Sequence, residues 1–226
     1  MIVKACGAPR GGKMKTRIII QRHGQSEANV RHIYAGHSDF PLSPLGHEQA
    51  RLGALALEGV KIDAIYSSDL SRAMQTAQPH AAMRGIPVTG DKNLREIYLG
   101  DWESGERDRL VREYPYEAVY IWQNFFGIFR APNGESAPDA AERFYNEVVR
   151  IARTHPDGTV LITAHAAVIR LFWGKVCGIA PECLAREIPF PMNASFSEVV
   201  FDGERLLPVK YSDDSHLSDA SAEPLK

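Results

Sequence analysis

The sequence has little of what marks several large classes of protein. Only three of its 226 residues are cysteine, namely Cys6, Cys177 and Cys183. They are too few and too irregularly spaced for a disulfide framework, and they fit a reducing compartment. No run of about 18 apolar residues occurs, which argues against a membrane-spanning helix. Residues 1–13 contain no apolar stretch of the kind that a secretory signal needs. We therefore expect a cytoplasmic protein without a membrane partner.

A strong charge of either sign is also missing. The formal net charge is -2, from 26 Lys and Arg against 28 Asp and Glu, so nothing in the charge favours nucleic acid as a partner. The GxxxxGK[ST] pattern of a nucleotide phosphate loop does not occur, which argues against a kinase-type site. What is present, 44% hydrophobic and 24% charged residues, is typical of a globular domain with a sizeable core.

The clearest chemical signal lies in Arg17–Asn29. Residues 17–20 are apolar and β-branched after the first position, which predicts a short strand buried on both faces of a parallel sheet. Arg22, His23 and Gly24 follow. A polar turn at the carboxyl end of a buried strand is where open α/β sheets bind ligands. Arginine suits phosphate, and a neutral histidine acts as a base or nucleophile. An ordinary solvated turn explains the triplet equally well on its own.

Two more predicted strands end in small polar residues or histidine. The strand at 63–67 leads into Ser68 and a helix at 70–83 that carries Arg72, and the strand at 159–163 leads into His165. Further expected elements are helices at 43–57, 139–154 and 166–176, an edge strand at 86–89, and a hairpin of strands 195–202 and 206–211. Pro79 is expected to kink or shorten its helix. This alternation predicts an α/β sandwich with a mainly parallel central sheet.

Two regions allow more than one interpretation. His32, His37 and Asp39 lie in one loop, but their spacing matches no standard metal-ligand pattern, so no metal site is expected. Residues 106–129 predict a helix rich in aromatics, for which core packing is favoured over a ligand cage. Four arginines in or beside it are candidates for binding a carboxylate or second phosphate: Arg107, Arg109, Arg112 and Arg130. A solvated helix face is the favoured interpretation for the first three.

Carboxyl ends of parallel strands meet at one edge of a sheet, so the polar residues that follow them are expected to lie together. They form a positively charged cup whose natural ligand is a phosphoryl group. His23 would attack phosphorus, Glu96 would protonate the leaving oxygen, and the arginines would supply the charge without a metal. The expected site residues are Arg22, His23, Asn29, Arg72, Glu96 and His165.

In order and spacing the motifs resemble the histidine phosphatase superfamily, which includes cofactor-dependent phosphoglycerate mutases and small phosphatases. Matches span about residues 17–202. They are Arg22-His23-Gly24-Gln25-Ser26-Glu27-Ala28-Asn29, Leu42-Ser43-Pro44-Leu45-Gly46, Ser67-Ser68-Asp69-Leu70-Ser71-Arg72-Ala73, Leu94-Arg95-Glu96, Gly100-Asp101-Trp102-Glu103, Gly134-Glu135-Ser136, Thr163-Ala164-His165 and Asn193-Ala194-Ser195.

The resemblance implies a three-layer α/β/α sandwich of the phosphoglycerate mutase type and no cofactor. It implies that His23 is the phosphorylated nucleophile and that Arg22, Arg72 and His165 bind the phosphoryl group with help from Asn29. Glu96 is implied as proton donor. The implied activity is that of a phosphomonoesterase of the histidine acid phosphatase type on small phosphorylated metabolites. Sugar phosphates, nucleotides, phosphoglycerate and a cobalamin-pathway ribosyl phosphate all stay open as substrates.

One departure from the family pattern is Ala166-Ala167, where glycines are common and where some members carry their acid instead. It leaves Glu96 as the donor, and its methyl groups are expected to narrow the cup. His165 follows Glu96 by 69 positions, a short interval that favours a phosphatase over a mutase. A third interpretation is a binding module of this fold that does not turn over substrate. It is disfavoured because all six expected site residues are present. The expected organisation is a flexible extension at 1–15, a single domain at 16–211 and a disordered tail at 212–226.

Overall fold

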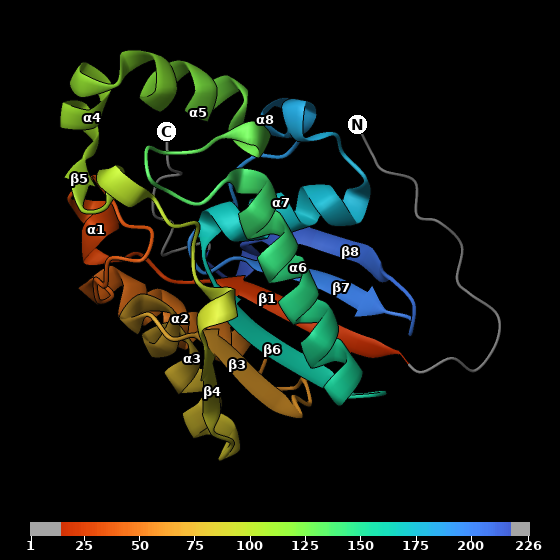
Figure 1. Ribbon diagram of the computed structural model, residues 1–226. Coiled ribbons are helices and arrows are strands. Elements are labelled where there is room, and N and C mark those ends of the chain that lie inside the picture. The colour runs from red at the N-terminus through yellow and green to blue at the C-terminus, as the bar shows by residue number, and fades with distance from the viewer. Residues whose placement is uncertain (1–14, 218–226) are drawn as a thin grey trace.

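The computed structural model describes residues 15–217 (Figure 1). Within them a six-stranded sheet has the order β4-β3-β6-β1-β7-β8. Its strands, in chain order, are β1 (Thr16–Arg22), β3 (Ala64–Ser68), β4 (Val88–Asp91), β6 (Thr159–Ala164), β7 (Phe196–Phe201) and β8 (Leu206–Asp213). A separate ribbon pairs β2 (Ile33–Tyr34) with β5 (Gly105–Glu106). The helices are α1 (Glu27–Val30), α2 (Pro44–Ala56), α3 (Ser71–Arg84), α4 (Arg107–Glu113), α5 (Trp122–Asn124), α6 (Ala137–Thr154), α7 (Ala166–Cys177) and α8 (Leu184–Glu187).

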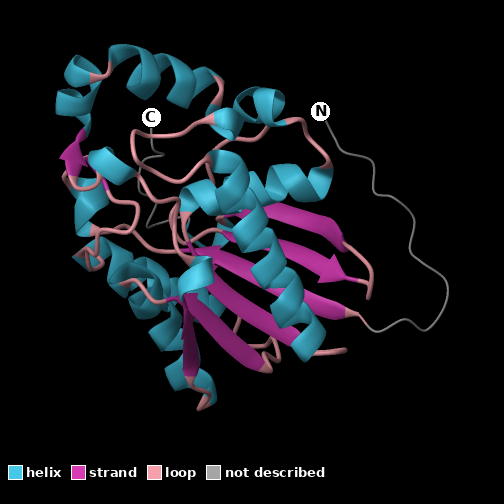
Figure 2. Ribbon diagram, in the orientation of Figure 1, coloured by secondary structure: helices cyan, strands magenta, loops and turns pink. Residues whose placement is uncertain are grey.

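Helices cover both faces of this sheet, as the colouring by secondary structure in Figure 2 makes clear. Side chains alternate between the faces of a strand. Ile18 and Ile20 accordingly pack into the core that contains residues of α6 and α7, whereas Ile19 packs into the second core with Ala77 of α3. The apolar run of β1 is therefore buried on both faces, and the predicted three-layer α/β/α sandwich is confirmed.

Strand register places the strand ends at the same level. β1 runs parallel to β6 with Arg22 opposite Ala164, and β3 runs parallel to β6 with Ser67 opposite Thr163. β4 is also parallel, whereas β7 and β8 add antiparallel strands on the other side of β1. The segments that follow β1, β3 and β6 therefore emerge at one edge, as predicted from the sequence.

Two expectations about helices need correction. Pro79 does not shorten its helix, since α3 runs continuously over 14 residues with Pro79 inside it and is packed against β3, β6 and α2. The kink expected at Pro79 stays a prediction. Residues 106–129 do not form one helix either. Pro115 interrupts them, and α4 is followed by a π-helical turn at Tyr116–Ile121, then α5 and a 3-10 turn.

The expected domain end at residue 211 is too early. β8 continues to Asp213, and a 3-10 turn at Ser215–Leu217 buries Leu217. The side-chain ring of His216 lies 4.8 Å from that of Phe196, so apolar contact orders a segment whose composition is polar. Residues 218–226, and residues 1–14 of the extension expected at 1–15, lie outside the described residues.

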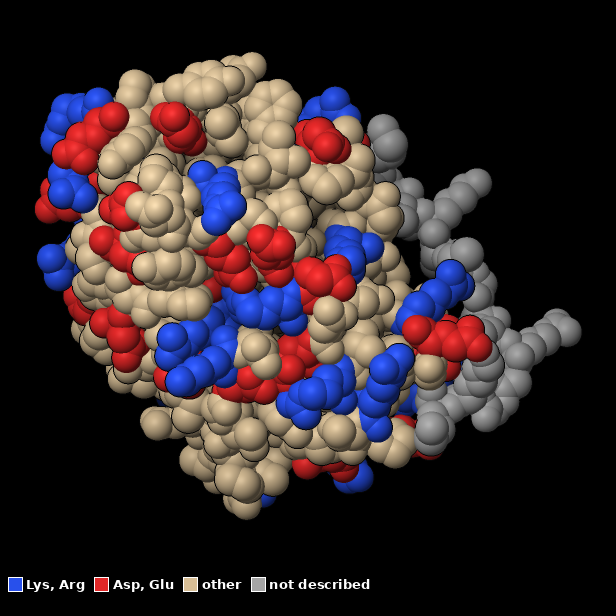
Figure 3. All heavy atoms as spheres, in the orientation of Figure 1, with Lys and Arg blue, Asp and Glu red and all other residues tan. Residues whose placement is uncertain are grey.

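The surface carries charges of both signs. On the face seen in Figure 3, Lys and Arg side chains lie beside Asp and Glu side chains rather than in separate areas. Several are paired, including Arg95 with Asp69 and Arg143 with Glu135. No helix in residues 15–217 is long and apolar enough to cross a membrane.

The turn after β1 packs directly on the first turn of α2. A Cβ atom added to Gly46 would lie 1.9 Å from the carbonyl oxygen of Gln25, and one added to Gly24 would lie 2.4 Å from the carbonyl oxygen of Gly46. Both distances are far below van der Waals contact, so only glycine fits at these positions. The side chain of His23 is therefore positioned by a backbone-to-backbone contact between two glycine turns.

We predict that Gly46→Ala destabilises the fold, because its methyl group must displace the backbone of the turn that carries His23. Overpacking of this kind typically costs about 1–3 kcal/mol. Gly59→Ala is the matched control, since a Cβ there meets nothing within 4 Å. Urea unfolding of both variants measures the difference. Equal free energies of unfolding for Gly46→Ala and Gly59→Ala would contradict the close approach.

Candidate functional site

His23 follows the last residue of β1 and is 5% exposed. Its Nδ1 lies 2.6 Å from the carbonyl oxygen of Gly24. A carbonyl oxygen only accepts, so Nδ1 carries the proton and Nε2 keeps its lone pair. Burial lowers the pKa of His23 well below 6.5, and the positive charges of Arg72 and Arg22 lower it further. The imidazole is therefore neutral at physiological pH, with the lone pair of Nε2 available.

Arg22 ends β1 and is 2% exposed. Its Nη1 donates to the carbonyl oxygen of Pro191 at 2.7 Å. Its Nε is buried and has no hydrogen-bond partner within residues 15–217. Burial lowers the pKa of Arg22 to about 10, so the guanidinium stays charged near pH 7.

Asn29 lies in α1 and its side chain has a fixed orientation. Its Oδ1 accepts from the backbone N–H and the hydroxyl of Ser26 at 3.0 and 3.1 Å, and from Nδ2 of Asn193 at 3.4 Å. The same Asn193 nitrogen donates to the carbonyl oxygen of His23 at 3.1 Å. With the oxygen anchored, the amide nitrogen of Asn29 is the free end, and the residue lines the cavity described below.

Arg72 and His165 form a buried pair across the sheet edge. Arg72 lies in the first turn of α3 and donates from Nε to Nδ1 of His165 at 3.2 Å. It also donates to the carbonyl oxygens of Ala35, Gly36 and Ser38, so it ties the loop before α2 to the site. Burial lowers the pKa of Arg72 to about 10.

Because His165 accepts at Nδ1, its proton is on Nε2. This Nε2 is buried and has no hydrogen-bond partner within the described chain. Burial and the charge of Arg72 lower the pKa of His165 well below 6.5, which keeps the ring neutral. The ring centres of His165 and His23 are 5.2 Å apart, so a donor nitrogen and a nucleophilic nitrogen lie on neighbouring rings.

Glu96 lies on the loop after β4, and its carboxylate sits at the N-terminal end of α7. Oε1 accepts from the backbone N–H groups of Ile97 and Val168 at 2.9 and 3.0 Å, and Oε2 accepts from that of Ala167 at 2.9 Å. Burial raises the pKa of Glu96 above 4.5, and these three bonds oppose that shift. Such a carboxyl group keeps its proton to higher pH than an exposed glutamate does, which suits a general acid.

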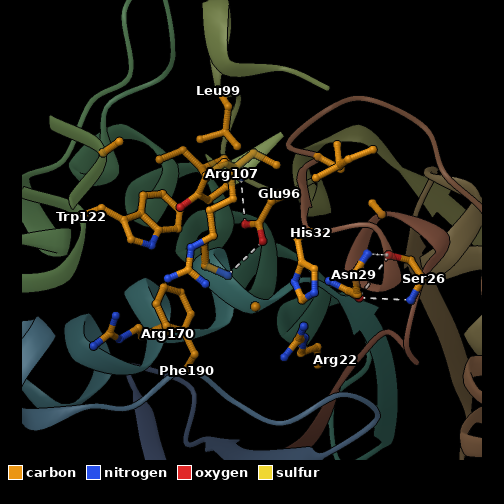
Figure 4. A pocket seen from close by; sticks show the side chains of 18 of the residues that line it. Arg22, Ser26, Asn29, His32, Glu96, Leu99, Arg107, Trp122, Arg170 and Phe190 are labelled. Atoms are coloured by element: carbon orange, nitrogen blue, oxygen red, sulfur yellow. Dashed lines mark hydrogen bonds between the residues drawn. The ribbon is translucent and has the colours of Figure 1, made fainter. Parts of the chain in front are cut away.

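A cavity of about 360 Å³ opens above these residues (Figure 4). Arg22, His23, Asn29, Arg72 and Glu96 line its polar part. His165 lies next to them beneath the surface, fully buried. The six expected site residues are thus brought together. Ala166 and Ala167 also line the cavity, as expected for the position where the sequence departs from the glycine pattern.

The surroundings of the residues that allowed more than one interpretation are as follows. No group of three His, Cys, Asp or Glu within residues 15–217 could hold a metal. His37 contacts the carbonyl oxygen of Glu96 through Nε2, and Asp39 accepts from Ser71. His32 lines the cavity. Core packing holds for Phe126 and Phe129, which are completely buried.

Arg107 corrects the sequence-based interpretation. The sequence favours a solvated helix face for Arg107, but in the structure this residue lines the cavity. Two of the other candidate arginines have partners on the protein: Arg109 pairs with Glu113, and Arg130 donates to the carbonyl oxygen of Gly134. The reason is the β2–β5 ribbon, which starts α4 beside the pocket. This ribbon cannot be predicted from sequence periodicity, because a strand of two residues is too short to show an alternating pattern.

Several cavity residues were not anticipated, among them Tyr34, Phe190 and Arg170. Arg170 lies below the aromatics with its guanidinium carbon 4.2 Å from the ring centre of Phe190. The segment of Phe190 contains two prolines and no periodic pattern. Asn193 belongs to a recognised motif, but its contacts with His23 and Asn29 follow only from the three-dimensional structure.

Comparison with known proteins agrees with this geometry. The sequence profile of the histidine phosphatase superfamily (branch 1) matches residues 18–214. The adenosylcobalamin/alpha-ribazole phosphatase of Escherichia coli K12 is 30% identical over 168 residues, 74% of this chain and 82% of that protein. A 2,3-bisphosphoglycerate-dependent phosphoglycerate mutase of Brucella ovis is 29% identical over 181 residues, 77% and 87% of the two chains.

Solved structures show the same fold. Bacillus stearothermophilus YhfR superposes with a TM-score of 0.85 at 30% identity, covering 90% of this chain and all of that one. A mycobacterial glucosyl-3-phosphoglycerate phosphatase in complex with VO3 gives a TM-score of 0.80 at 27% identity, covering 88% and 99%. The profile match, these similarities and the arrangement of His23, Arg22, Arg72 and His165 lead to one conclusion: the chain belongs to the histidine phosphatase superfamily.

Proposed function

We propose that the protein is a phosphomonoester hydrolase that forms a covalent phosphohistidine on His23 and acts on small phosphorylated metabolites. One observation carries the proposal. The lone pair of His23 Nε2 lies in a buried site where two N–H groups, Arg22 Nε and His165 Nε2, have no acceptor among the described residues. Buried donors are normally satisfied. Phosphoryl oxygens are the acceptors that satisfy them while the lone pair meets phosphorus.

In the first step Nε2 of His23 attacks phosphorus, and the bond between phosphorus and the ester oxygen breaks. The bonding electrons go to the alcohol oxygen, which takes the proton of the Glu96 carboxyl group. Arg22, His165 and the amide nitrogen of Asn29 donate to the non-bridging oxygens. Arg72 contributes its charge and holds His165 in the required tautomer. Loss of a single donor to such a charge typically costs about 3–4 kcal/mol of barrier.

In the second step water attacks the phosphohistidine. The Glu96 carboxylate takes a proton from the water, the bond between phosphorus and nitrogen breaks, and the electron pair returns to His23. Phosphate then leaves. The positive charge of two buried arginines performs the stabilisation that bound metal ions perform in other phosphoryl transferases, so we propose that turnover needs no metal. The chemistry is that of the histidine acid phosphatase type.

A mutase is the second candidate, and the 29% identity with the Brucella ovis mutase favours it. The short interval between Glu96 and His165 and the similarity to two phosphatases support hydrolysis instead. The assay that separates them combines p-nitrophenyl phosphate hydrolysis with EDTA present and interconversion of 3- and 2-phosphoglycerate with the bisphosphorylated primer. We expect hydrolysis without interconversion, and the reverse result would assign a mutase.

We predict that His23→Ala lowers kcat/KM by at least about a thousandfold, because removal of a nucleophile eliminates the covalent route. Rapid acid-free quenching with ³²P-labelled substrate should trap a base-stable, acid-labile phosphoprotein in the wild type and none in His23→Ala. His47→Ala is the control, since His47 is exposed on α2. Labelled protein in His23→Ala at the wild-type level would disprove the assignment of the nucleophile.

We predict that the loss of kcat/KM in Glu96→Gln depends on the leaving group of the substrate. General acid catalysis is worth about 10²- to 10⁴-fold for an alcohol that needs a proton, whereas p-nitrophenolate leaves without one. We expect the loss in kcat/KM to fall on alkyl phosphates and to be small for p-nitrophenyl phosphate. Glu106→Gln, an exposed acid on β5, should change neither. Equal losses for both substrates would rule out Glu96 as the donor.

The pH profile follows from the same groups. The first step needs Glu96 protonated, and burial raises its pKa above 4.5, so the protonated form persists to higher pH than for an exposed glutamate. It needs His23 neutral, and the lowered pKa of His23 preserves that form below pH 6.5. We therefore expect kcat/KM for an alkyl phosphate to fall as pH rises through the pKa of Glu96. This alkaline decline should vanish in Glu96→Gln, and its persistence there would assign it to another group.

A further inference from the structure

The cavity extends beyond the residues assigned to the phosphoryl group, and its outer part is apolar. Six side chains from the ribbon, the loop after Glu96, α4, the π-helical turn, α5 and the loop before β7 form its walls: Ile33, Leu99, Val111, Val119, Trp122 and Phe190. The rings of Trp122 and Phe190 are nearly parallel, with an interplanar angle of 19° and centres 6.0 Å apart. The walls thus suit an apolar body.

Within the described chain two arginines lie at this apolar region, Arg107 and Arg170. Figure 4 shows the guanidinium of Arg107 reaching into the cavity beside Trp122 and Phe190, on the same side as Glu96. Its base is held firmly, because the backbone N–H of Arg107 donates to the carbonyl oxygen of His32 at 3.0 Å and the preceding residues belong to the β2–β5 ribbon. Arg107 is therefore positioned by regular structure rather than by a loose loop.

The guanidinium of Arg107 is uncommitted. Within residues 15–217 it makes no ion pair and donates no side-chain hydrogen bond. The neighbouring arginines are different. Arg109 pairs with Glu113, and Arg170 donates to the carbonyl oxygens of Ile188 and Ala185 while it lies over Phe190. A guanidinium without a partner in residues 15–217 that projects among apolar walls is available to an anionic group of a ligand.

We propose that Arg107 is a specificity residue, which binds a carboxylate on the alcohol portion of the substrate. The inference rests on the proposed phosphatase function and names its substrate class: phosphomonoesters whose leaving group carries a carboxylate on an apolar body. A single planar guanidinium matches one carboxylate through two parallel hydrogen bonds. A second phosphate would carry about two charges, whereas Arg107 offers one, and the nearby Arg170 already donates to the carbonyl oxygens of Ile188 and Ala185, so the geometry favours the singly charged group.

The test uses esters that differ only in this group. The substrates are phenyl phosphate, 3- and 4-carboxyphenyl phosphate, and 3- and 4-carbamoylphenyl phosphate, whose amide has the shape of the carboxylate without its charge. For each isomer the ratio of kcat/KM between carboxylate and amide is measured in the wild type, in Arg107→Gln and in Arg109→Gln. A hydrogen-bonded ion pair of this kind corresponds to about a tenfold or larger effect.

We expect the ratio for at least one isomer to exceed unity in the wild type and in Arg109→Gln, and to fall about tenfold or more in Arg107→Gln, mainly through KM. Arg107→Lys should restore part of the ratio. Ratios that are the same in the wild type and Arg107→Gln for both isomers would overturn the proposal. The comparison of ratios cancels any general damage that Arg107→Gln does to turnover.

Binding provides an arm that is independent of turnover. Benzylphosphonate and 4-carboxybenzylphosphonate cannot be hydrolysed, and calorimetry gives their affinities directly. Tighter binding of the carboxylate in the wild type but not in Arg107→Gln supports the proposal, and equal preference in both proteins overturns it. Absence of hydrolysis of every ester would refute the proposed phosphatase function while leaving this binding result to decide the role of Arg107.

Discussion

The in-register pairing of β1, β6 and β3 is the constraint on which the rest of the site depends. Arg22 lies opposite Ala164 in the β1–β6 pair, so His23 and His165 leave the sheet at the same level and their rings meet. A shift of one residue in either strand would turn the side chains to the opposite face. The hydrophobic pattern of β1 prevents such a shift, because Ile18, Ile19 and Ile20 fill two different cores.

The chemistry follows from burial of positive charge around neutral imidazoles. Arg22 and Arg72 keep their protons because the pKa of a guanidinium is high enough to tolerate the loss of solvation. The ordinary pKa of histidine is already close to physiological pH, so the same burial leaves His23 and His165 uncharged. A single environment thereby produces two fixed cations and two neutral imidazoles, one with a lone pair at Nε2 and one with a proton there. Backbone carbonyls of Ala35, Gly36 and Ser38 accept hydrogen bonds from Arg72, and that of Pro191 accepts one from Arg22, so both guanidinium groups are held in place.

The sequence was sufficient for the sheet and for the six polar residues, since these depend on apolar runs that end in a recognisable polar turn. The sequence was insufficient for the segments that cover the site at the edge of the sheet. Residues 106–129 have helical periodicity, yet Pro115 and long-range contacts divide them into short turns. Arg107 and Arg109 are two positions apart on one helix, and no local pattern tells which of them faces the cavity. Phe190 and Asn193 reach the site through a segment without regular structure, and the burial of Leu217 depends on a core far away in the sequence.

The hydrogen bonds of Glu96 also determine which of its oxygens carries the proton. Oε1 uses both of its lone pairs to accept from Ile97 and Val168, whereas Oε2 accepts only from Ala167. Each carboxyl oxygen has two such pairs in the molecular plane, so only Oε2 has room for hydrogen. In the proposed mechanism Oε2 would therefore exchange the proton, while Oε1 holds the carboxyl group in place. Because the amides of Ala167 and Val168 belong to the helix that follows His165, the proposed proton donor and the proposed phosphoryl-binding histidine are anchored to the same segment of the chain.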